Sequence, residues 1–268
     1  MSRIGQTMAR LREQGQVGLI AYLTVGYPDI ETTLRLVPAL AASGADMVEL
    51  GMPFSDPLAD GATIQRASHH ALQQGVTPAV CLEVVKQLRA RGLAIPLLLM
   101  GYYNPILAYG IDEFARDAAG AGADGLIGVD LPPEEAIEVQ AAGADRGLDL
   151  IYLLAPTSSD ERIALVAAQA TGFIYCVSLT GVTGARGQLP SGLPQFLARV
   201  RRYTSLPLAV GFGISKREHL KAVAGLGVEA AVIGSAIIDV IDRAPAAERE
   251  ERVREYVEVV TGRRKATV

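Results

Sequence analysis

Two carboxylates, Glu49 and Asp60, are the strongest candidates for acid–base chemistry in this chain of 268 residues. Glu49 lies in the run DMVEL, where it alternates with Val48 and Leu50. If that apolar pair packs beneath helices, Glu49 points to the opposite face of a buried strand, where loss of water raises the pKa of a carboxyl group. The alternative is a glutamate at the rim that reaches solvent. The alternation favours the interior position, and with it a role for Glu49 in proton transfer.

Asp60 follows eleven residues later, in the segment GMPFSDPLADG. It precedes Gly61, and Asp56 in the same segment precedes Pro57. Aspartate beside glycine or proline also suits a turn or a helix cap. The residues alone therefore leave the role of Asp60 open.

Three glycine-containing turns occur late in the chain, at 181–184, 211–215 and 233–235. The last two follow apolar runs that read as the seventh and eighth strands. Many barrels bind phosphate at this place through backbone N–H groups and a short helix N-terminus. Ser235 would add a hydroxyl donor. The glycines would also suit simple tight turns, but their shared position favours a phosphate site.

The types and positions of the remaining reactive residues argue against other mechanisms. None of the lysines ends an expected strand, so a Schiff base is disfavoured. The histidines fall on expected helices without metal-ligand spacing, which predicts no metal site. These residues are Lys86, Lys216, Lys221, Lys265, His69, His70 and His219. We therefore expect acid–base chemistry without a cofactor, carried by carboxylates and a tyrosine.

Eight apolar runs, separated by amphipathic segments, must position these residues. The runs begin near positions 18, 46, 95, 124, 148, 172, 206 and 229. Runs that are apolar on both parities are typical of parallel strands covered by helices. Eight such units predict an α/β fold, a (βα)8 TIM barrel in a single domain (1–268), with an extra N-terminal helix and an inserted helix after strand 2. A doubly wound sheet is the main alternative, but LTVGYPD after the first strand lacks a dinucleotide fingerprint.

The charge and composition of the chain limit the classes of binding partner and the cellular location that we expect. The net charge of −4 is spread along the chain, which predicts no binding to nucleic acid or to an anionic membrane. The polar N-terminus and the lack of a long apolar run argue against a signal peptide or a membrane span. Cys81 and Cys176 show no disulfide spacing. We expect a cytoplasmic protein.

Several motifs in order carry a family resemblance. They are AYLTVGYPD, GADMVELGMPFSDPLADG, GYYNPI, GVDLPPEE, YLLAPTS, SLTGVTGAR, VGFGIS and VIGSAI. With them, and with ELGMPFSDPLADG above all, the chain resembles the alpha subunit of tryptophan synthase. The resemblance covers most of the chain, whereas the two ends match only in general character.

The resemblance implies retro-aldol cleavage of indole-3-glycerol phosphate to indole and glyceraldehyde 3-phosphate, in tryptophan biosynthesis. It implies that Glu49 protonates C3 of the indole ring, that Asp60 binds the indole N–H, and that Tyr175 orients Glu49 or the substrate. The phosphate would be bound by Gly184, Gly213, Gly234 and Ser235. The indole pocket would comprise Tyr22, Met100, Ile127, Thr183, Phe212 and Val232, with Tyr at position 22 where some relatives have Phe.

The resemblance also implies a partner. This is the beta subunit of tryptophan synthase, which uses pyridoxal phosphate, in an α2β2 tetramer. The partner surface would comprise Pro53, Phe54, Asp56, Pro57, Asn104 and Pro132. Three alternatives stay open: a stand-alone indole-releasing lyase, a non-catalytic barrel that regulates a partner, and another phosphate-binding barrel enzyme. An indole-ring-forming synthase of that last kind would need a strand-end lysine.

Overall fold

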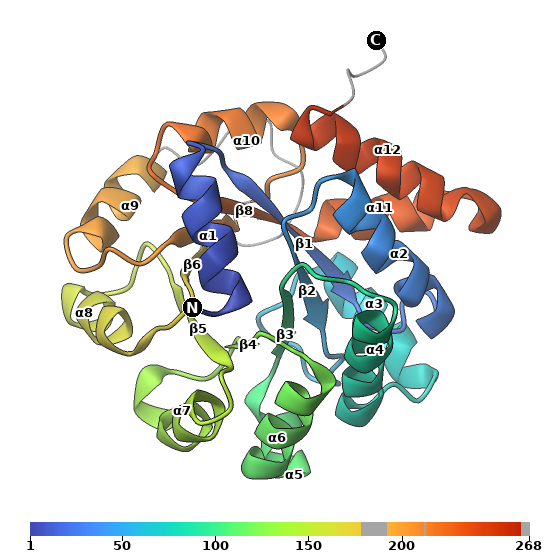
Figure 1. Cartoon of the computed structure of the whole chain (residues 1–268), viewed down its shortest axis with the longest axis horizontal. Helices are drawn as coiled ribbons and strands as arrows, with labels where there is room; N and C mark the ends of the chain where they lie inside the picture. The colour runs from blue at the N-terminus through green and yellow to red at the C-terminus, as the bar shows by residue number, and fades with distance from the viewer. Residues whose placement is uncertain (178–191, 212, 264–268) are drawn as a thin grey trace.

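Eight parallel strands form a closed barrel in the computed structural model, which describes residues 1–177, 192–211 and 213–263 (Figure 1). The strands are β1 (Gly18–Thr24), β2 (Met47–Gly51), β3 (Leu97–Gly101), β4 (Gly125–Gly128), β5 (Asp149–Leu154), β6 (Ile174–Val177), β7 (Leu208–Gly211) and β8 (Ala230–Ile233). Each begins within two residues of its predicted start. The strands pair in chain order, and β8 closes the barrel against β1. The predicted TIM barrel is confirmed.

Helices surround the barrel (Figure 1). They are α1 (Arg3–Glu13), α2 (Ile30–Ser43), α3 (Ala62–Gln73), α4 (Pro78–Ala90), α5 (Tyr103–Tyr109), α6 (Ile111–Ala121), α7 (Ile137–Ala144), α8 (Asp160–Gln169), α9 (Leu193–Arg201), α10 (Arg217–Ala224), α11 (Ser235–Arg243) and α12 (Arg249–Thr261), with short 3-10 helices at Pro133–Glu135 and Ala246–Glu248. The extra helix α1 and the inserted helix α3 match the prediction. No helix in the described ranges has the length and hydropathy that a membrane crossing requires.

Local signals in the sequence set the ends of these helices. Asp29 begins α2 by accepting a hydrogen bond from the backbone of Thr32, and Thr77 begins α4 in the same way. Gly44 and Gly262 end α2 and α12 with φ angles of 114° and 82°. These left-handed conformations suit glycine and stop a helix.

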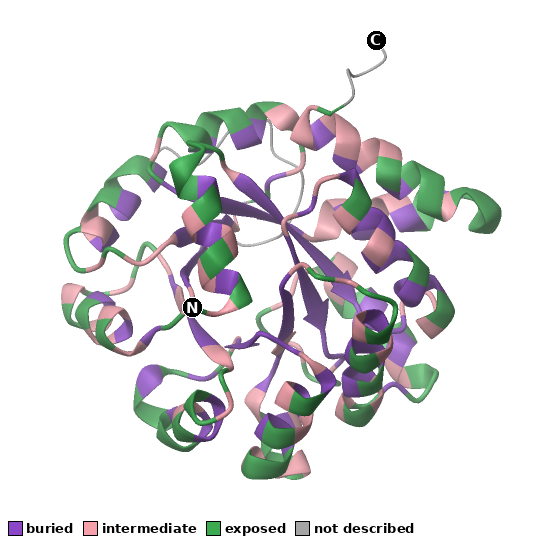
Figure 2. Cartoon of the chain, viewed as in Figure 1, coloured by how far each residue is buried: buried purple, intermediate pink, exposed green. Residues whose placement is uncertain are grey.

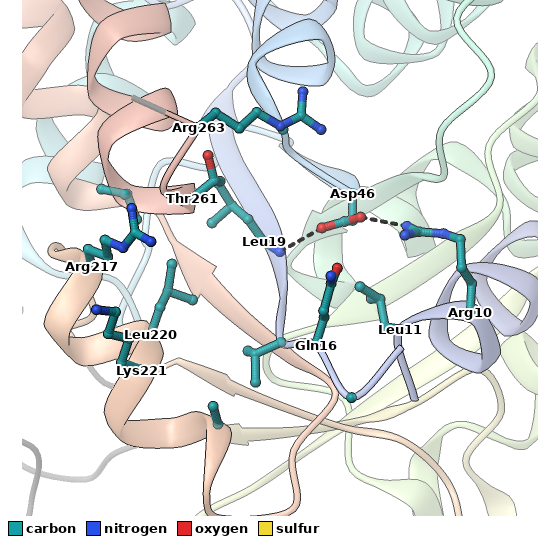
Figure 3. A pocket seen from close by; sticks show the side chains of 15 residues that line it. Arg10, Leu11, Gln16, Leu19, Asp46, Arg217, Leu220, Lys221, Thr261 and Arg263 are labelled. Carbon is teal, nitrogen blue, oxygen red and sulfur yellow. Dashed lines mark hydrogen bonds and ion pairs between the residues drawn. The ribbon is translucent and has the colours of Figure 1, made fainter. Parts of the chain in front are cut away.

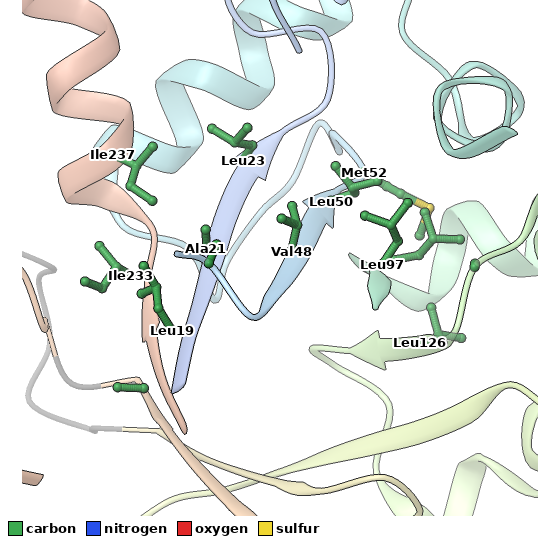
Figure 4. Close-up of a cluster of buried hydrophobic side chains, with 14 of the residues drawn as sticks. Leu19, Ala21, Leu23, Val48, Leu50, Met52, Leu97, Leu126, Ile233 and Ile237 are labelled. Carbon is green, nitrogen blue, oxygen red and sulfur yellow. The ribbon is translucent and has the colours of Figure 1, made fainter. Parts of the chain in front are cut away.

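Two apolar layers alternate along each strand. The strands are largely buried (Figure 2). On β2, Val48 and Leu50 belong to the layer between barrel and helices (Figure 4), whereas Met47 belongs to the barrel interior. Leu98 and Ile127 continue the interior layer on β3 and β4. This alternation is the parity that the sequence predicts, and it places Glu49 on the interior side.

Helix α1 closes the end of the barrel where the strands begin. Its apolar side packs into the interior cluster, as Figure 1 shows for its position across the barrel. Its polar side binds acidic residues at or just before four strand starts. The contacts are Ser2 to Asp149 (2.5 Å), Arg3 to Asp124 (2.7 Å), Arg10 to Asp46 (2.5 Å) and Arg12 to Glu229 (2.8 Å). Chemistry must therefore take place at the opposite end, where the strands finish.

Replacing Asp124 by asparagine tests the polar contacts that attach α1 to the strand starts, which we call the α1 clamp. Asp124 is buried and binds Arg3, Arg89 (2.5 Å) and the backbone N–H of Leu97 (2.8 Å). Removing one partner of a buried ionic network leaves the other charge uncompensated, which costs about 3 kcal/mol. We expect Asp124→Asn to lower the free energy of unfolding by about that amount in urea titrations. The exposed Asp145→Asn is the control. Equal stability of the two variants would contradict the clamp.

Candidate active site

Glu49 lies inside the barrel near the carboxyl end of β2. It sits between Tyr22 on β1 and Leu98 on β3 in the strand register and is fully buried. Neither carboxylate oxygen has a hydrogen-bond partner among the described residues. Burial without a counter-charge raises the pKa of Glu49 to about 8. The alternative of a solvent-reaching rim glutamate is wrong, and the group is poised to give and take a proton near neutral pH.

Two buried tyrosines share the interior with Glu49. The negative charge of Glu49 contributes to raising the pKa of both Tyr22 and Tyr175, whose main cause is burial. Both phenols therefore stay protonated at neutral pH and act as neutral groups. Glycines on β2 and β7 make room for them. A Cβ atom at Gly51 would lie 2.2 Å from the Tyr22 hydroxyl, and one at Gly211 would lie 2.7 Å from the Tyr175 hydroxyl.

Asp60 lies in the loop between β2 and α3, close enough for its charge to contribute to raising the pKa of both Tyr22 and Tyr175. Partial burial raises its pKa to about 6, although the Tyr102 hydroxyl counteracts the shift by hydrogen bonding. Asp56 has a different environment, because it is exposed and accepts a hydrogen bond from Ser55 (2.5 Å). The structure thus separates two aspartates that the residue pattern alone left equivalent. Asp60 is the one that is partly buried and acts on the interior tyrosines.

Tyr102 holds this loop and was missed by the sequence reasoning. It follows β3 directly, and its hydroxyl accepts the backbone N–H of Ala59 at 2.9 Å. Its ring packs on Phe54 with centroids 5.1 Å apart. Tyr102 thus contacts two residues, Phe54 and Ala59, of the loop that carries Asp60. Its place at the carboxyl end of a barrel strand was the signal that could have identified it.

Removal of the Tyr102 hydroxyl should weaken catalysis through Asp60. Hydrogen bonds to charged groups are worth about 1.5–3 kcal/mol, so we expect Tyr102→Phe to lower kcat about tenfold. The pKa of Asp60 should rise, because one group that lowers it is gone. Steady-state rates of Tyr102→Phe and of the neighbouring Tyr103→Phe, compared across pH, test this. Equal rates for both variants would show that Tyr102 does not position Asp60.

The predicted phosphate residues lie beyond β7 and β8. Gly213 is exposed with a φ angle of 65°, Gly234 precedes α11, and Ser235 is its first residue. The first backbone N–H groups of a helix have no partner within the helix and attract anions. Tyr22 packs on Gly234, where a Cβ atom would lie 3.2 Å from its ring. The phosphate end and the Glu49 end of the site are therefore adjacent. Gly184 lies outside the described residues.

The predicted indole pocket is described in part. Tyr22, Ile127 and Val232 are buried in or beside the interior cluster, and Met100 packs against it. Thr183 and Phe212 lie outside the described residues. The described part is an apolar wall around Glu49, which suits a flat aromatic ring.

The predicted partner surface lies around the barrel mouth. Asp56, Asn104 and Pro132 are exposed, while Phe54 and Pro57 are partly buried. Pro53 is buried, so its side chain does not belong to the surface of the isolated chain. Two exposed leucines there were missed by the sequence reasoning. They are Leu58 and Leu107, with exposed fractions of 94 % and 53 %.

Residues for other mechanisms lie away from the interior. His69 and His70 are exposed on α3, and His219 is buried on α10, where Ser215 donates its backbone N–H to the ring. Lys86, Lys216 and Lys221 are exposed on or beside helices. Lys265 lies outside the described residues. Within the described ranges, no three His, Cys, Asp or Glu residues form a metal-binding group.

A closed (βα)8 barrel with a buried carboxylate of raised pKa near the carboxyl ends of its strands has the features of a barrel enzyme. Comparison with known proteins narrows the class. The model of the family described as "Tryptophan synthase alpha chain" matches residues 8–267. The chain belongs to this family.

Individual relatives match this chain in sequence or structure over most of its length. The tryptophan synthase alpha chain of Roseiflexus sp. (strain RS-1) is 57 % identical, over 98 % of this chain and 100 % of that protein. The crystal structure of tryptophan synthase subunit alpha from Legionella pneumophila str. Paris is 38 % identical, with a TM-score of 0.90 over 98 % of each chain. A chain of the tryptophan synthase complex from Pyrococcus furiosus is 38 % identical, with a TM-score of 0.85 over 91 % of this chain and 98 % of that one.

Proposed function

We propose that this chain cleaves indole-3-glycerol phosphate to indole and glyceraldehyde 3-phosphate, as the alpha subunit of tryptophan synthase in tryptophan biosynthesis. Family membership supports the reaction, and the burial of Glu49 in an apolar interior is the observation that supports the mechanism most directly. The residue roles below are part of the proposal.

Glu49 acts as the proton donor. Breaking the bond between C3 of the indole ring and the adjacent side-chain carbon needs a place for the bonding electrons. When the protonated Glu49 gives its proton to C3, the ring becomes a cation with an electron-accepting C=N bond. Loss of the side-chain hydroxyl proton, which the Glu49 carboxylate helps to remove, forms the aldehyde and sends the bonding electrons into the ring. Indole and glyceraldehyde 3-phosphate result, and Glu49 ends protonated. A pKa of about 8 suits both directions of transfer.

Asp60 stabilises the cation. With a pKa of about 6 it is a carboxylate at neutral pH, so it can accept the indole N–H and oppose the positive charge that develops there. Tyr175, buried and neutral, orients Glu49 or the substrate. The step therefore needs no lysine, metal or redox group from this chain.

The rest of the substrate is bound at the carboxyl ends of the strands. Backbone groups at Gly184, Gly213 and Gly234, with Ser235, bind the phosphate, and the α11 N-terminus supports the last two. The indole ring lies among Tyr22, Met100, Ile127, Thr183, Phe212 and Val232. In this arrangement the ring reaches Glu49 while the phosphate stays near solvent.

The partner is the beta subunit of tryptophan synthase, in an α2β2 assembly, and pyridoxal phosphate belongs to that subunit. The structural relative from Pyrococcus furiosus comes from a tryptophan synthase complex. We assign the contact to the mouth residues Phe54, Asp56, Pro57, Asn104 and Pro132, to which the exposed Leu58 adds apolar surface. We place this single-domain enzyme in the cytoplasm, where the buried free thiols of Cys81 and Cys176 stay reduced.

Indole release from indole-3-glycerol phosphate tests this function. The purified chain is assayed alone and with a tryptophan synthase beta subunit. Release that increases with the beta subunit is the expected result. Full activity without it would favour a stand-alone lyase, and no indole under either condition would favour a non-catalytic barrel and overturn the proposal.

A further inference from the structure

A polar pocket of about 410 Å³ lies at the barrel end opposite the candidate active site (Figure 3). It is bounded by the start of β1, the end of α2, helix α10 and the end of α12. The strands begin at this end, so the barrel and α1 separate the pocket from Glu49. Its volume falls within the range of pockets that bind small molecules.

Cations outnumber anions around this pocket. The charged side chains that line it are Arg10, Arg217, Lys221, Arg263 and Asp46. Asp46 is already satisfied, because it binds Arg10 at 2.5 Å and accepts the backbone N–H of Leu19 at 3.0 Å. Within the described residues, no carboxylate lies within ion-pairing distance of the other three cations. Four cationic side chains and one carboxylate thus line this pocket, in a chain whose net charge is −4.

The C-terminal ends of α1, α2 and α12 compensate part of this positive charge, because helix C-termini carry partial negative charge. Arg263 makes such a contact, since its Nη1 donates to the carbonyl of Ala42 at 3.0 Å. Arg217 and Lys221 make no such contact within the described residues. They lie four residues apart on α10, side by side in Figure 3, and their head groups donate to no carbonyl or carboxylate in the described ranges. Two cationic groups thus remain for a ligand.

The head groups of Arg217 and Arg263 pack against glycine backbone at the edge of the pocket. A Cβ atom at Gly262 would lie 2.1 Å from the Arg217 guanidinium, so that group rests directly on the glycine backbone. A Cβ atom at Gly44 would lie 2.9 Å from Nε of Arg263. Glycine at the ends of α12 and α2 therefore leaves space for both guanidinium groups beside the pocket.

We propose that this pocket binds a small multivalent anion through phosphate or carboxylate groups, with Arg217 and Lys221 as the main ligands and Arg263 as a third. The planar guanidinium pairs with two oxygens of either group, and the lysine ammonium adds a mobile point charge. Gln16 and Thr261, which also line the pocket, offer an amide and a hydroxyl to the remainder of the ligand.

A local fluorescent probe tests the proposal. The chain has no tryptophan, and Ala224, exposed at the end of α10, lines the pocket. The fluorescence of Ala224→Trp is therefore specific to this end of the barrel and insensitive to phosphate bound in the active site. Pyrophosphate and citrate are titrated separately at constant ionic strength, which distinguishes a phosphate ligand from a carboxylate ligand. We expect a saturable change with at least one of them.

The matched variants decide the assignment. Adding Arg217→Gln and Lys221→Gln to the probe variant should weaken binding by about tenfold or more, because charge-assisted hydrogen bonds are lost. Lys221→Gln alone, at an exposed position, should weaken it less and keeps the test valid if the double variant folds poorly. Lys86→Gln with Arg116→Gln makes the same charge change elsewhere and should leave binding within twofold. No saturable change with either probe, or equal loss in both double variants, would overturn the proposal.

Discussion

Glu49→Gln should lower kcat for indole release by about a thousandfold, in line with the usual contribution of a positioned acid–base group. Glutamine keeps the size and polarity of the side chain but cannot transfer a proton. The effect should fall on kcat rather than on ligand binding, because Glu49 lies in the barrel interior and the phosphate residues lie beyond β7 and β8. Steady-state assays with the beta subunit measure kcat, and calorimetric titration with glycerol 3-phosphate measures ligand binding. A rate within twofold of wild type would contradict the mechanism.

The same variant should gain stability relative to wild type as the pH rises. The pKa of Glu49 is raised in the folded protein, from 4.5 to about 8. The stability linked to its protonation is therefore fully present below pH 4.5 and is lost as the pH rises through about 8, amounting to roughly 3–5 kcal/mol. Glutamine does not ionise. The difference in Tm between Glu49→Gln and wild type should thus grow in favour of the variant from pH 5 to pH 9, which separates lost chemistry from lost folding.

Asp60→Asn should lower kcat by about a hundredfold, the scale on which one preorganised charge or hydrogen bond stabilises a transition state. Asparagine keeps the shape of the side chain but removes the negative charge that opposes the indole cation. Its amide can still accept the indole N–H, so the loss should be smaller than for Glu49→Gln. Rates of both variants and of wild type, measured under the same conditions, give this order. A rate for Asp60→Asn within twofold of wild type would exclude the charge-stabilising role.

The two carboxylates differ in how far the sequence could predict them. Glu49 follows from alternation on a strand, because a barrel strand with helices on one side leaves only the interior for the other parity. Asp60 lies in a loop, where no periodicity applies, and its direction depends on Tyr102, more than forty residues away in the chain. Loop geometry of this kind is set by tertiary contacts, so the residue pattern could not choose between Asp56 and Asp60, and only the family resemblance favoured Asp60.

The same distinction applies to the fold. The strand starts follow from the apolar runs, and the helix ends follow from caps such as Asp29 and Gly44. The attachment of α1 does not, because it depends on acidic residues near strand starts, such as Asp124 and Glu229, that are dispersed along the chain. The pocket beside α10 was also beyond the sequence, since its cations come from α1, from α10 and from the residue that follows the C-cap of α12. Only the closed barrel brings them together.

The pH dependence of kcat/KM tests the central claim most directly, because it reports the ionisation of both carboxylates in the free enzyme. Glu49 must be protonated to donate its proton, and Asp60 must be ionised to stabilise the cation. We predict a bell-shaped profile that falls below about pH 6, the pKa of Asp60, and above about pH 8, the pKa of Glu49. The alkaline limb should be absent from the residual activity of Glu49→Gln. A wild-type rate that stays constant from pH 7 to pH 10 would contradict the account.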